Sequence, residues 1–248
     1  IMDIVTASDL IMVARGDLGV EIPAEQVPAT QKKIIKLCNL EGKPVITATQ
    51  MMDSMIRNPR PTRAEVADVA NAIYDGTDVI MLSGETASGK YPVEAVRIMV
   101  DIAKATEESL NYDNILKEKG RFKDTGVTNA IGHATCTSAQ GLRAAAILTP
   151  TATGHTSQVV SKFRPKAPIL AFTTTEKVAR QLSLVWGVIP IVTEAVDTEK
   201  DVFLDAIRRS QEKGFLSEGD LIVITAGAPV GVGGMTNMLR IHIVGNKI

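Results

Sequence analysis

The chain has 248 residues, 45% hydrophobic and 22% charged, which is ordinary for a globular protein of one or two domains. A net charge of −1 and an aromatic content of 4% argue against binding to nucleic acid or to an anionic membrane surface. Without an eighteen-residue apolar run or a paired-cysteine motif, the chain is expected to be cytoplasmic, with Cys38 and Cys136 as inert thiols.

Three short apolar segments in the first part of the chain have the character of parallel strands. They span residues 10–16, 44–50 and 79–84, and their composition is typical of strands buried on both faces. Each ends in a polar cluster, RGD, TQMM or SGET. Because the carboxyl ends of parallel strands share one edge, we expect the three clusters to converge there.

Helical patterns alternate with these strands. Residues 27–42 are predicted to form a helix that stops at Gly42, and the next helix begins at Thr62, with Glu65 at the spacing of a capping box. A further helix is predicted from Pro92 onward.

The segment GETASGK, residues 84–90, matches the phosphate-binding pattern GxxxxGK. Tyr91 stands where that motif needs a Ser or Thr for magnesium, and the predicted helix starts too late to join a phosphate cradle. We therefore reject a P-loop and expect Lys90 to be a surface residue.

A second alternation of strands and helices follows a charged segment at residues 112–126, which we interpret as a linker. Strands are predicted at 145–151, 167–174, 188–194, 220–227 and 238–245, with helices between them. The predicted domains are 1–111, the linker 112–126, and 127–248 as a complete doubly wound α/β domain.

The first block is too small to form a domain by itself. Three parallel strands would leave open edges and an uncovered apolar face. A partial TIM barrel, three of eight βα units, fits best because the polar clusters lie at one rim. We therefore expect the chain, which does not begin with Met, to be part of a longer protein.

Long strings in both blocks resemble the pyruvate kinase family. The strings VARGDLGVEIP (13–23), residues 42–78 and MLSGETASGKYPVEAV (81–96) are similar to the last three βα units of that barrel. FRPKAPILAFT (163–173) and GDLIVITAGAPVG (219–231) are similar to the family's C-terminal domain. The resemblance implies phosphoryl transfer from phosphoenolpyruvate to ADP, giving pyruvate and ATP in glycolysis.

The resemblance also implies roles for residues at the strand ends. Asp17 would bind Mg²⁺ or Mn²⁺, while the N–H groups of Gly16 and Asp17 and the hydroxyl of Thr49 would bind the substrate carboxylate. We hypothesise that Thr49 and Ser83 hold the water that protonates the enolate. Taken alone, Asp17 is more typical of a helix cap than of a metal ligand, and the hydroxyls of Thr49 and Ser83 are typical of hydrogen bonds at a strand end.

Other polar residues near the strand ends have simpler explanations. We expect Arg15 to tie neighbouring loops together, and Arg60 and Arg63 to be solvated or subunit-bridging charges. The methionines at positions 51, 52 and 55 are predicted to fill the core beneath the rim.

In the second block, the loop at 149–158 resembles the family's binding site for a sugar phosphate effector. The residues concerned are Thr151, Thr153, Gly154, His155 and Thr156. His155 departs from the Arg or Lys of several activated relatives, which predicts weaker or pH-dependent phosphate binding. The alternative, a capped loop without a ligand, remains open, and residues 231–237 are a candidate cover for a ligand.

The family's catalytic Lys, second metal carboxylate and potassium ligands have no counterpart in this chain, so we expect the chain alone to be inactive. The resemblance implies a K⁺-dependent homotetramer. The alternative function is a non-catalytic module that binds a sugar phosphate or a protein partner.

Overall fold

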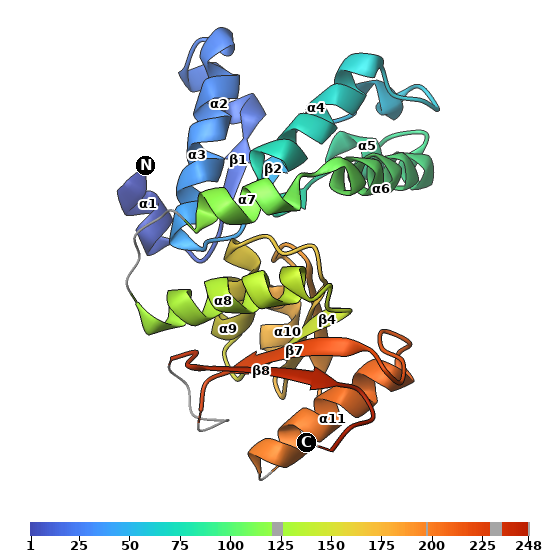
Figure 1. Ribbon diagram of the computed structural model, residues 1–248. Coiled ribbons are helices and arrows are strands. Elements are labelled where there is room, and N and C mark those ends of the chain that lie inside the picture. Colours follow the sequence, from blue (N-terminus) through green and yellow to red (C-terminus); the bar gives the residue numbers. More distant parts are fainter. Residues whose placement is uncertain (121–125, 197, 229–234, 248) are drawn as a thin grey trace. The chain divides into compact units, whose positions relative to one another are not determined.

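The computed structural model describes residues 1–120, 126–196, 198–228 and 235–247 (Figure 1). The chain divides into two units, Ile1–Leu110 and Asn111–Ile248. Both alternate helices with mostly parallel strands, which confirms the predicted α/β class. No described helix has both the length and the apolar character needed to span a membrane.

The first unit contains three βα units in sequence. Its elements are α1 (Met2–Ala7), β1 (Ile11–Ala14), α2 (Arg15–Glu21), η1 (Ala24–Gln26), α3 (Val27–Glu41), β2 (Val45–Ala48), η2 (Asp53–Ile56), α4 (Arg63–Asp75), β3 (Val79–Ile80), α5 (Gly84–Ala87) and α6 (Pro92–Ser109). The strands form one parallel sheet in the order β1-β2-β3.

The helix ends follow the signals in the sequence. Gly42 ends α3 in a left-handed conformation with φ of 68°, which costs a glycine little because it has no Cβ. Thr62 Oγ1 accepts from the Glu65 N–H at 3.2 Å, and Glu65 Oε2 accepts from the Thr62 N–H at 2.7 Å. The predicted capping box is therefore confirmed.

Burial on both faces was expected of all three strands, and this is wrong for β1. Val13 is 1% exposed and packs with Ile35 and Cys38 of α3, whereas Met12 on the opposite face is 49% exposed. The reason is that successive side chains of a strand point to opposite faces, and the helices of this unit cover only one face of β1.

The second unit contains a five-stranded sheet. Its elements are α7 (Tyr112–Lys119), α8 (Val127–Gly141), β4 (Ala146–Pro150), α9 (His155–Lys162), β5 (Ile169–Thr173), α10 (Glu176–Leu182), β6 (Val188–Val192), α11 (Glu199–Glu212), β7 (Leu221–Ala226) and β8 (Met238–Ile243). The strand order is β6-β5-β4-β7-β8, and all neighbours are parallel except the pair β7 and β8.

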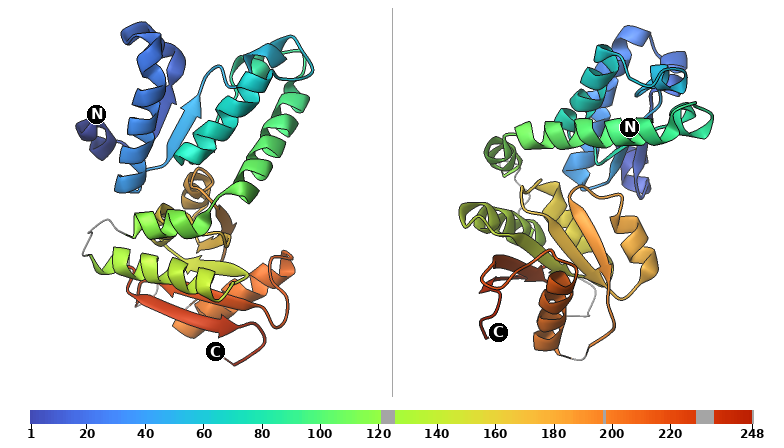
Figure 2. Two further views of the ribbon diagram at one scale, coloured as in Figure 1. Left: turned by 45° about the horizontal axis from the view of Figure 1, so that its top comes forward. Right: turned by 90° about the vertical axis from the view of Figure 1, so that its right-hand side faces the viewer.

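Helices cover both faces of this sheet, as expected of a doubly wound domain (Figure 2). Ile147 of β4 packs with residues of α8, α9 and α10, and the adjacent Leu148 packs with Phe203 of α11. The alternation places every second strand residue in one of two cores, which explains the nearly continuous apolar composition of β4 and β5.

The segment predicted as a linker, 112–126, begins with helix α7, and residues 121–125 lie outside the described part. Leu116 of α7 is 7% exposed and joins the core formed by α8 and α9. One buried side chain on a highly charged helix gives too weak an apolar stripe to recognise from sequence.

Candidate functional site

The polar ends of β1, β2 and β3 lie at the same edge of the first sheet. Ala14 pairs with Ala48, and Thr47 pairs with Ile80, all in parallel register. The predicted convergence of the three polar clusters is therefore confirmed.

The turn after β2 has an unusual backbone. Thr49 and Gln50 have φ values of 70° and 52°, a region that residues other than glycine seldom adopt. Thr49 Oγ1 accepts a hydrogen bond of 3.0 Å from the Gly16 N–H. Two predicted substrate-binding residues are thus in direct contact, and the Thr49 hydroxyl retains its own hydrogen to donate to a ligand.

Arg15 holds this turn in place. Its Nη2 donates to the Thr49 carbonyl oxygen at 2.6 Å, its Nε to the Ala48 carbonyl at 3.3 Å, and its Nη1 to the carboxylate of Asp68 on α4 at 2.6 Å. The prediction that Arg15 ties neighbouring loops together is confirmed. Sequence reasoning missed Asp68, because its proximity to Arg15 arises only when α4 packs beside the sheet.

Glu85 connects the loops after β2 and β3. This carboxylate is 2% exposed, and it accepts from the Met52 N–H at 3.0 Å and from the Ser83 N–H at 2.8 Å. Within the described residues, the Ser83 hydroxyl makes no hydrogen bond. Sequence reasoning assigned no role to Glu85; the available signal was a carboxylate directly after an apolar strand.

Asp17 is exposed in the first turn of α2, a position that favours a negative charge. Its carboxylate has no partner among the residues that the structure describes. Those residues also include no group of three or more His, Cys, Asp or Glu side chains able to hold a metal ion. Among the described rim residues, Asp17 thus offers an exposed carboxylate without a partner, whereas the Glu85 carboxylate is buried and hydrogen-bonded.

The remaining rim residues behave as predicted. The methionines at positions 51, 52 and 55 are fully buried. Lys90 is exposed, and α6 begins two residues after it at Pro92, so the geometry of a P-loop is absent from this described segment.

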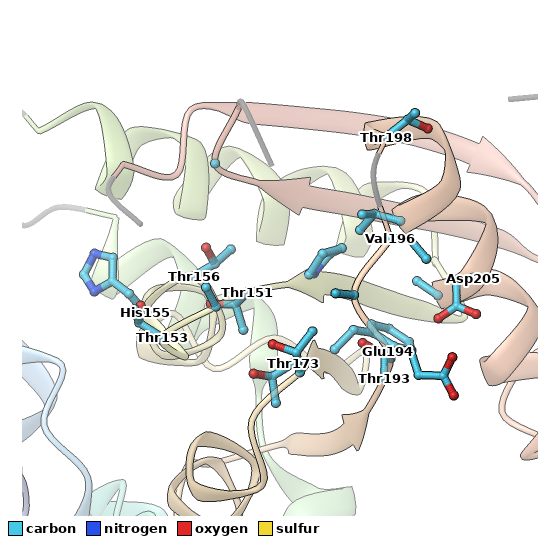
Figure 3. A pocket seen from close by; sticks show the side chains of 18 of the residues that line it. Thr151, Thr153, His155, Thr156, Thr173, Thr193, Glu194, Val196, Thr198 and Asp205 are labelled. Carbon is cyan, nitrogen blue, oxygen red and sulfur yellow. The ribbon is translucent and has the colours of Figure 1, made fainter. Parts of the chain in front are cut away.

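In the second unit, a cavity of about 300 Å³ opens at the carboxyl ends of β4, β5 and β6 (Figure 3). Four of the five residues predicted to bind an effector phosphate line it: Thr151, Thr153, His155 and Thr156. Gly154 shapes the loop instead. Its φ is 86°, and its N–H donates to Thr151 Oγ1 at 3.0 Å.

Sequence reasoning missed the opposite wall of this cavity. Thr173 ends β5, Thr193 and Glu194 follow β6, and Asp205 comes from α11. The signal that could have found Thr193 and Glu194 was their polar character at the carboxyl end of the predicted strand 188–194. Residues 231–234 of the proposed cover lie outside the described residues.

Neither cysteine has the environment of a reactive thiol. Both are buried and free. Burial and the nearby charge of Asp78 raise the pKa of Cys38 to about 11, and burial also raises the pKa of Cys136. Both side chains therefore remain neutral thiols near neutral pH, as predicted.

Comparison with known proteins gives matches across both units. The family described as "Pyruvate kinase, barrel domain" matches residues 1–96, and "Pyruvate kinase, alpha/beta domain" matches residues 129–242. A pyruvate kinase of Clostridium acetobutylicum is 53% identical over 97% of this chain and 51% of its own length. One from Geobacillus stearothermophilus is 54% identical over 99% of the chain and 42% of its own length.

A solved structure agrees with these matches. The crystal structure of a pyruvate kinase from Cryptosporidium parvum superposes with a TM-score of 0.90 at 40% identity, over 97% of this chain and 48% of that one. The chain spans about half the length of the curated relatives it matches.

Proposed function

The chain belongs to the pyruvate kinase family, and on that premise we propose that the protein containing it transfers a phosphoryl group from phosphoenolpyruvate to ADP. The observation that carries this proposal is the hydrogen bond from the Gly16 N–H to Thr49 Oγ1 at the shared edge of the sheet. That contact joins the first turn of α2 to the turn after β2, and the polar groups of both suit a small carboxylic acid bearing a phosphate.

The rim supports a divalent cation site only in part. The exposed carboxylate of Asp17 suits Mg²⁺ or Mn²⁺, which prefer oxygen ligands. When bound, such an ion neutralises the charge that develops on phosphate and enolate oxygens. Because Glu85 is buried and hydrogen-bonded, Asp17 is the carboxylate that the described rim leaves open to an ion. We propose that other ligands, including those for K⁺, come from elsewhere in the protein, and that the chain alone is inactive.

Thr49 and Ser83 are proposed to position the water that supplies the final proton to the enolate. Both hydroxyls have a hydrogen to donate, and Glu85 connects their two loops. Neither hydroxyl is acidic enough to donate a proton unaided at neutral pH, so their role is to orient water rather than to act as the acid.

The test is a Ser83→Ala variant of the protein that contains this chain. Phosphoenolpyruvate should bind with unchanged affinity while turnover falls by about 10²-fold, the usual size of a lost general acid–base contribution. The control is Ser88→Ala, at an exposed hydroxyl of the same loop that bonds only the Gly84 carbonyl, at 3.4 Å. Turnover that is equal in the two variants would remove Ser83 from the mechanism.

The cavity of the second unit supports a regulatory role for this domain, or its use as a separate binding module. We propose that a sugar phosphate binds there, with its phosphate at the start of α9. Calorimetry on the 248-residue chain tests this, and the absence of heat with any sugar phosphate would leave the loop as a capped turn without a ligand.

Assembly and location are proposed from the family. Among the described residues, β8 pairs with β7 alone, and its side chains Ile241 and Ile243 are exposed, which supports contact with another subunit in a homotetramer. We propose that the protein acts in the cytoplasm, where glycolytic substrates are available. Sedimentation equilibrium of the protein containing this chain would show four subunits.

A further inference from the structure

Two carboxylates of α4 restrain the segment that follows β2. Glu65 and Asp68 are three residues apart, so they lie on the same face of this helix. Glu65 Oε1 accepts a hydrogen bond of 2.7 Å from the Ser54 N–H. Asp68 acts through a second residue, because it binds Arg15, and Arg15 binds the Thr49 carbonyl oxygen. One face of α4 thus restrains the segment at two points, Thr49 and Ser54.

The guanidinium of Arg15 divides its donors between the Thr49 turn and α4. Nη2 donates to the Thr49 carbonyl oxygen at 2.6 Å and to Met51 Sδ at 2.9 Å, and Nε donates to the same carbonyl at 3.2 Å. Nη1 donates to Asp68, at 2.7 Å from Oδ1 and 2.6 Å from Oδ2. Among the residues that the structure describes, Asp68 is the only acceptor for Nη1 and the only ion-pair partner of Arg15.

Arg15 lies beside the groups that are proposed to bind the substrate carboxylate. Gly16 follows it in the chain and donates its N–H to Thr49 Oγ1, and Thr49 also accepts from Arg15 through its carbonyl oxygen. A guanidinium without a partner binds carboxylates and phosphates through two parallel donors. Without Asp68, Arg15 would therefore be free to leave the Thr49 carbonyl oxygen for an anionic substrate.

The ion pair of Arg15 with Asp68 is open to water at one end. The Arg15 side chain is 12% exposed and the Asp68 side chain 36%. An ion pair with a partner this exposed usually contributes little to folding stability. The Thr49 turn differs, because a φ of 70° persists only where surrounding contacts impose it. Loss of Asp68 should therefore displace Thr49 more than it destabilises α4.

We propose that Asp68 is a positioning residue for phosphoryl transfer. It keeps the Arg15 guanidinium on the Thr49 turn and away from the substrate, so that the Thr49 hydroxyl stays where the substrate carboxylate binds. The inference rests on the proposed function and adds to it a residue that touches no substrate. A displacement of about 1 Å in a binding group is enough to lower a rate substantially, because the reacting groups must be held in a narrow range of geometry.

The test is an Asp68→Asn variant of the protein that contains this chain, assayed for pyruvate formation from phosphoenolpyruvate and ADP. We expect kcat/KM for phosphoenolpyruvate to fall by about tenfold or more. Asp75→Asn is the matched control, because it removes the ion pair with Lys32 at the other end of the same helix. The control should change kcat/KM by less than about twofold, and the two variants should have similar urea midpoints.

A double-mutant cycle with Thr49→Val separates positioning from a general loosening of the structure. Val has the shape of Thr but no hydroxyl, so there is no hydroxyl left for Asp68 to position. In the Thr49→Val background, Asp68→Asn should therefore lower kcat/KM by less than about twofold further. A loss that stays at about tenfold in this background would show that Asp68 does not act through Thr49 and would overturn the proposal.

Asp68→Glu is the second variant, because it keeps a negative charge for Arg15 on a side chain one carbon longer. It should retain more of the wild-type kcat/KM than Asp68→Asn does. Equal losses in the two variants would contradict the role of the carboxylate charge.

The two proposals fail in different ways. Normal turnover in Asp68→Asn would overturn the role of Asp68 and leave the proposed function standing, and so would equal losses in Asp68→Asn and Asp75→Asn. If the unaltered protein forms no pyruvate from phosphoenolpyruvate and ADP, both proposals are wrong.

Discussion

The Arg15 guanidinium binds the carbonyl oxygen of Thr49 through Nη2 at 2.6 Å and Nε at 3.2 Å, at a turn where Thr49 has a φ of 70°. A planar fork of two donors on one oxygen restrains the peptide more strongly than a single donor does. The contact therefore stabilises a backbone conformation that Thr would not adopt by itself.

Replacing Arg15 by Lys should show this restraint. Lys keeps the positive charge but lacks the two guanidinium donors that bind the Thr49 carbonyl oxygen. We therefore expect the free energy of unfolding to fall by about 2 kcal/mol, as measured by urea denaturation. Arg63→Lys, at the exposed first residue of α4, is the control and should change it by less than about 0.5 kcal/mol. If the two variants are equally stable, the Thr49 turn does not depend on Arg15.

Replacement of the buried carboxylate of Glu85 by an amide should destabilise the protein. In Glu85→Gln one of its two acceptors becomes an NH₂ group that faces a backbone N–H, either of Met52 or of Ser83. We expect a loss of about 1–3 kcal/mol in unfolding free energy, and reduced turnover in the protein that contains this chain. Glu94→Gln, on the exposed face of α6, is the matched control. A Glu85→Gln variant as stable as this control would show that the hydrogen bonds of Glu85 to Met52 and Ser83 do not stabilise the protein.

Glu65 should make the stability of the first unit depend on pH. Burial acts to raise its pKa, but hydrogen bonds from Ser54 and Thr62 outweigh burial, so the pKa lies below the ordinary 4.5. A lowered pKa means that the stabilisation is complete above pH 4.5 and is lost as the pH falls through the lower, folded value.

Glu65→Gln should therefore cost about 1 kcal/mol at pH 7 and progressively less below pH 4.5. Urea midpoints between pH 7 and pH 3 measure this difference. A cost that stays constant across the range would mean that the ionised form of Glu65 contributes nothing to the capping box.

Gly132 and Gly141 lie in the same helix, α8, but their replacement by Ala should have opposite effects on stability. A Cβ at Gly132 would lie 2.7 Å from Val159 Cγ1 and 3.1 Å from Phe163 Cε2, whereas a Cβ at Gly141 meets nothing within 4 Å. Gly132→Ala should destabilise by about 1–3 kcal/mol through overpacking. Gly141→Ala should be neutral or stabilising by up to about 1 kcal/mol, and thermal unfolding distinguishes the two.

Local patterns in the chain were sufficient to predict the order and type of most elements and the sheet edge at which the candidate site lies. Apolar runs, the capping box at Thr62 and the stop at Gly42 are local signals, because the residues that produce each structure are neighbours in the chain. The long strings of the first block also determined the family, and with it the candidate roles of Asp17, Thr49 and Ser83.

The contacts between side chains of different elements could not be predicted from these local patterns. Residues from different elements meet in the ion pair of Arg15 with Asp68 and in the hydrogen bond of Glu85 with Met52. The cavity wall that includes Glu194 is likewise formed by residues from several elements. The antiparallel direction of β8 relative to β7 also depends on tertiary structure. Such contacts depend on how helices and strands pack, and packing selects among many partners that local patterns leave equally allowed.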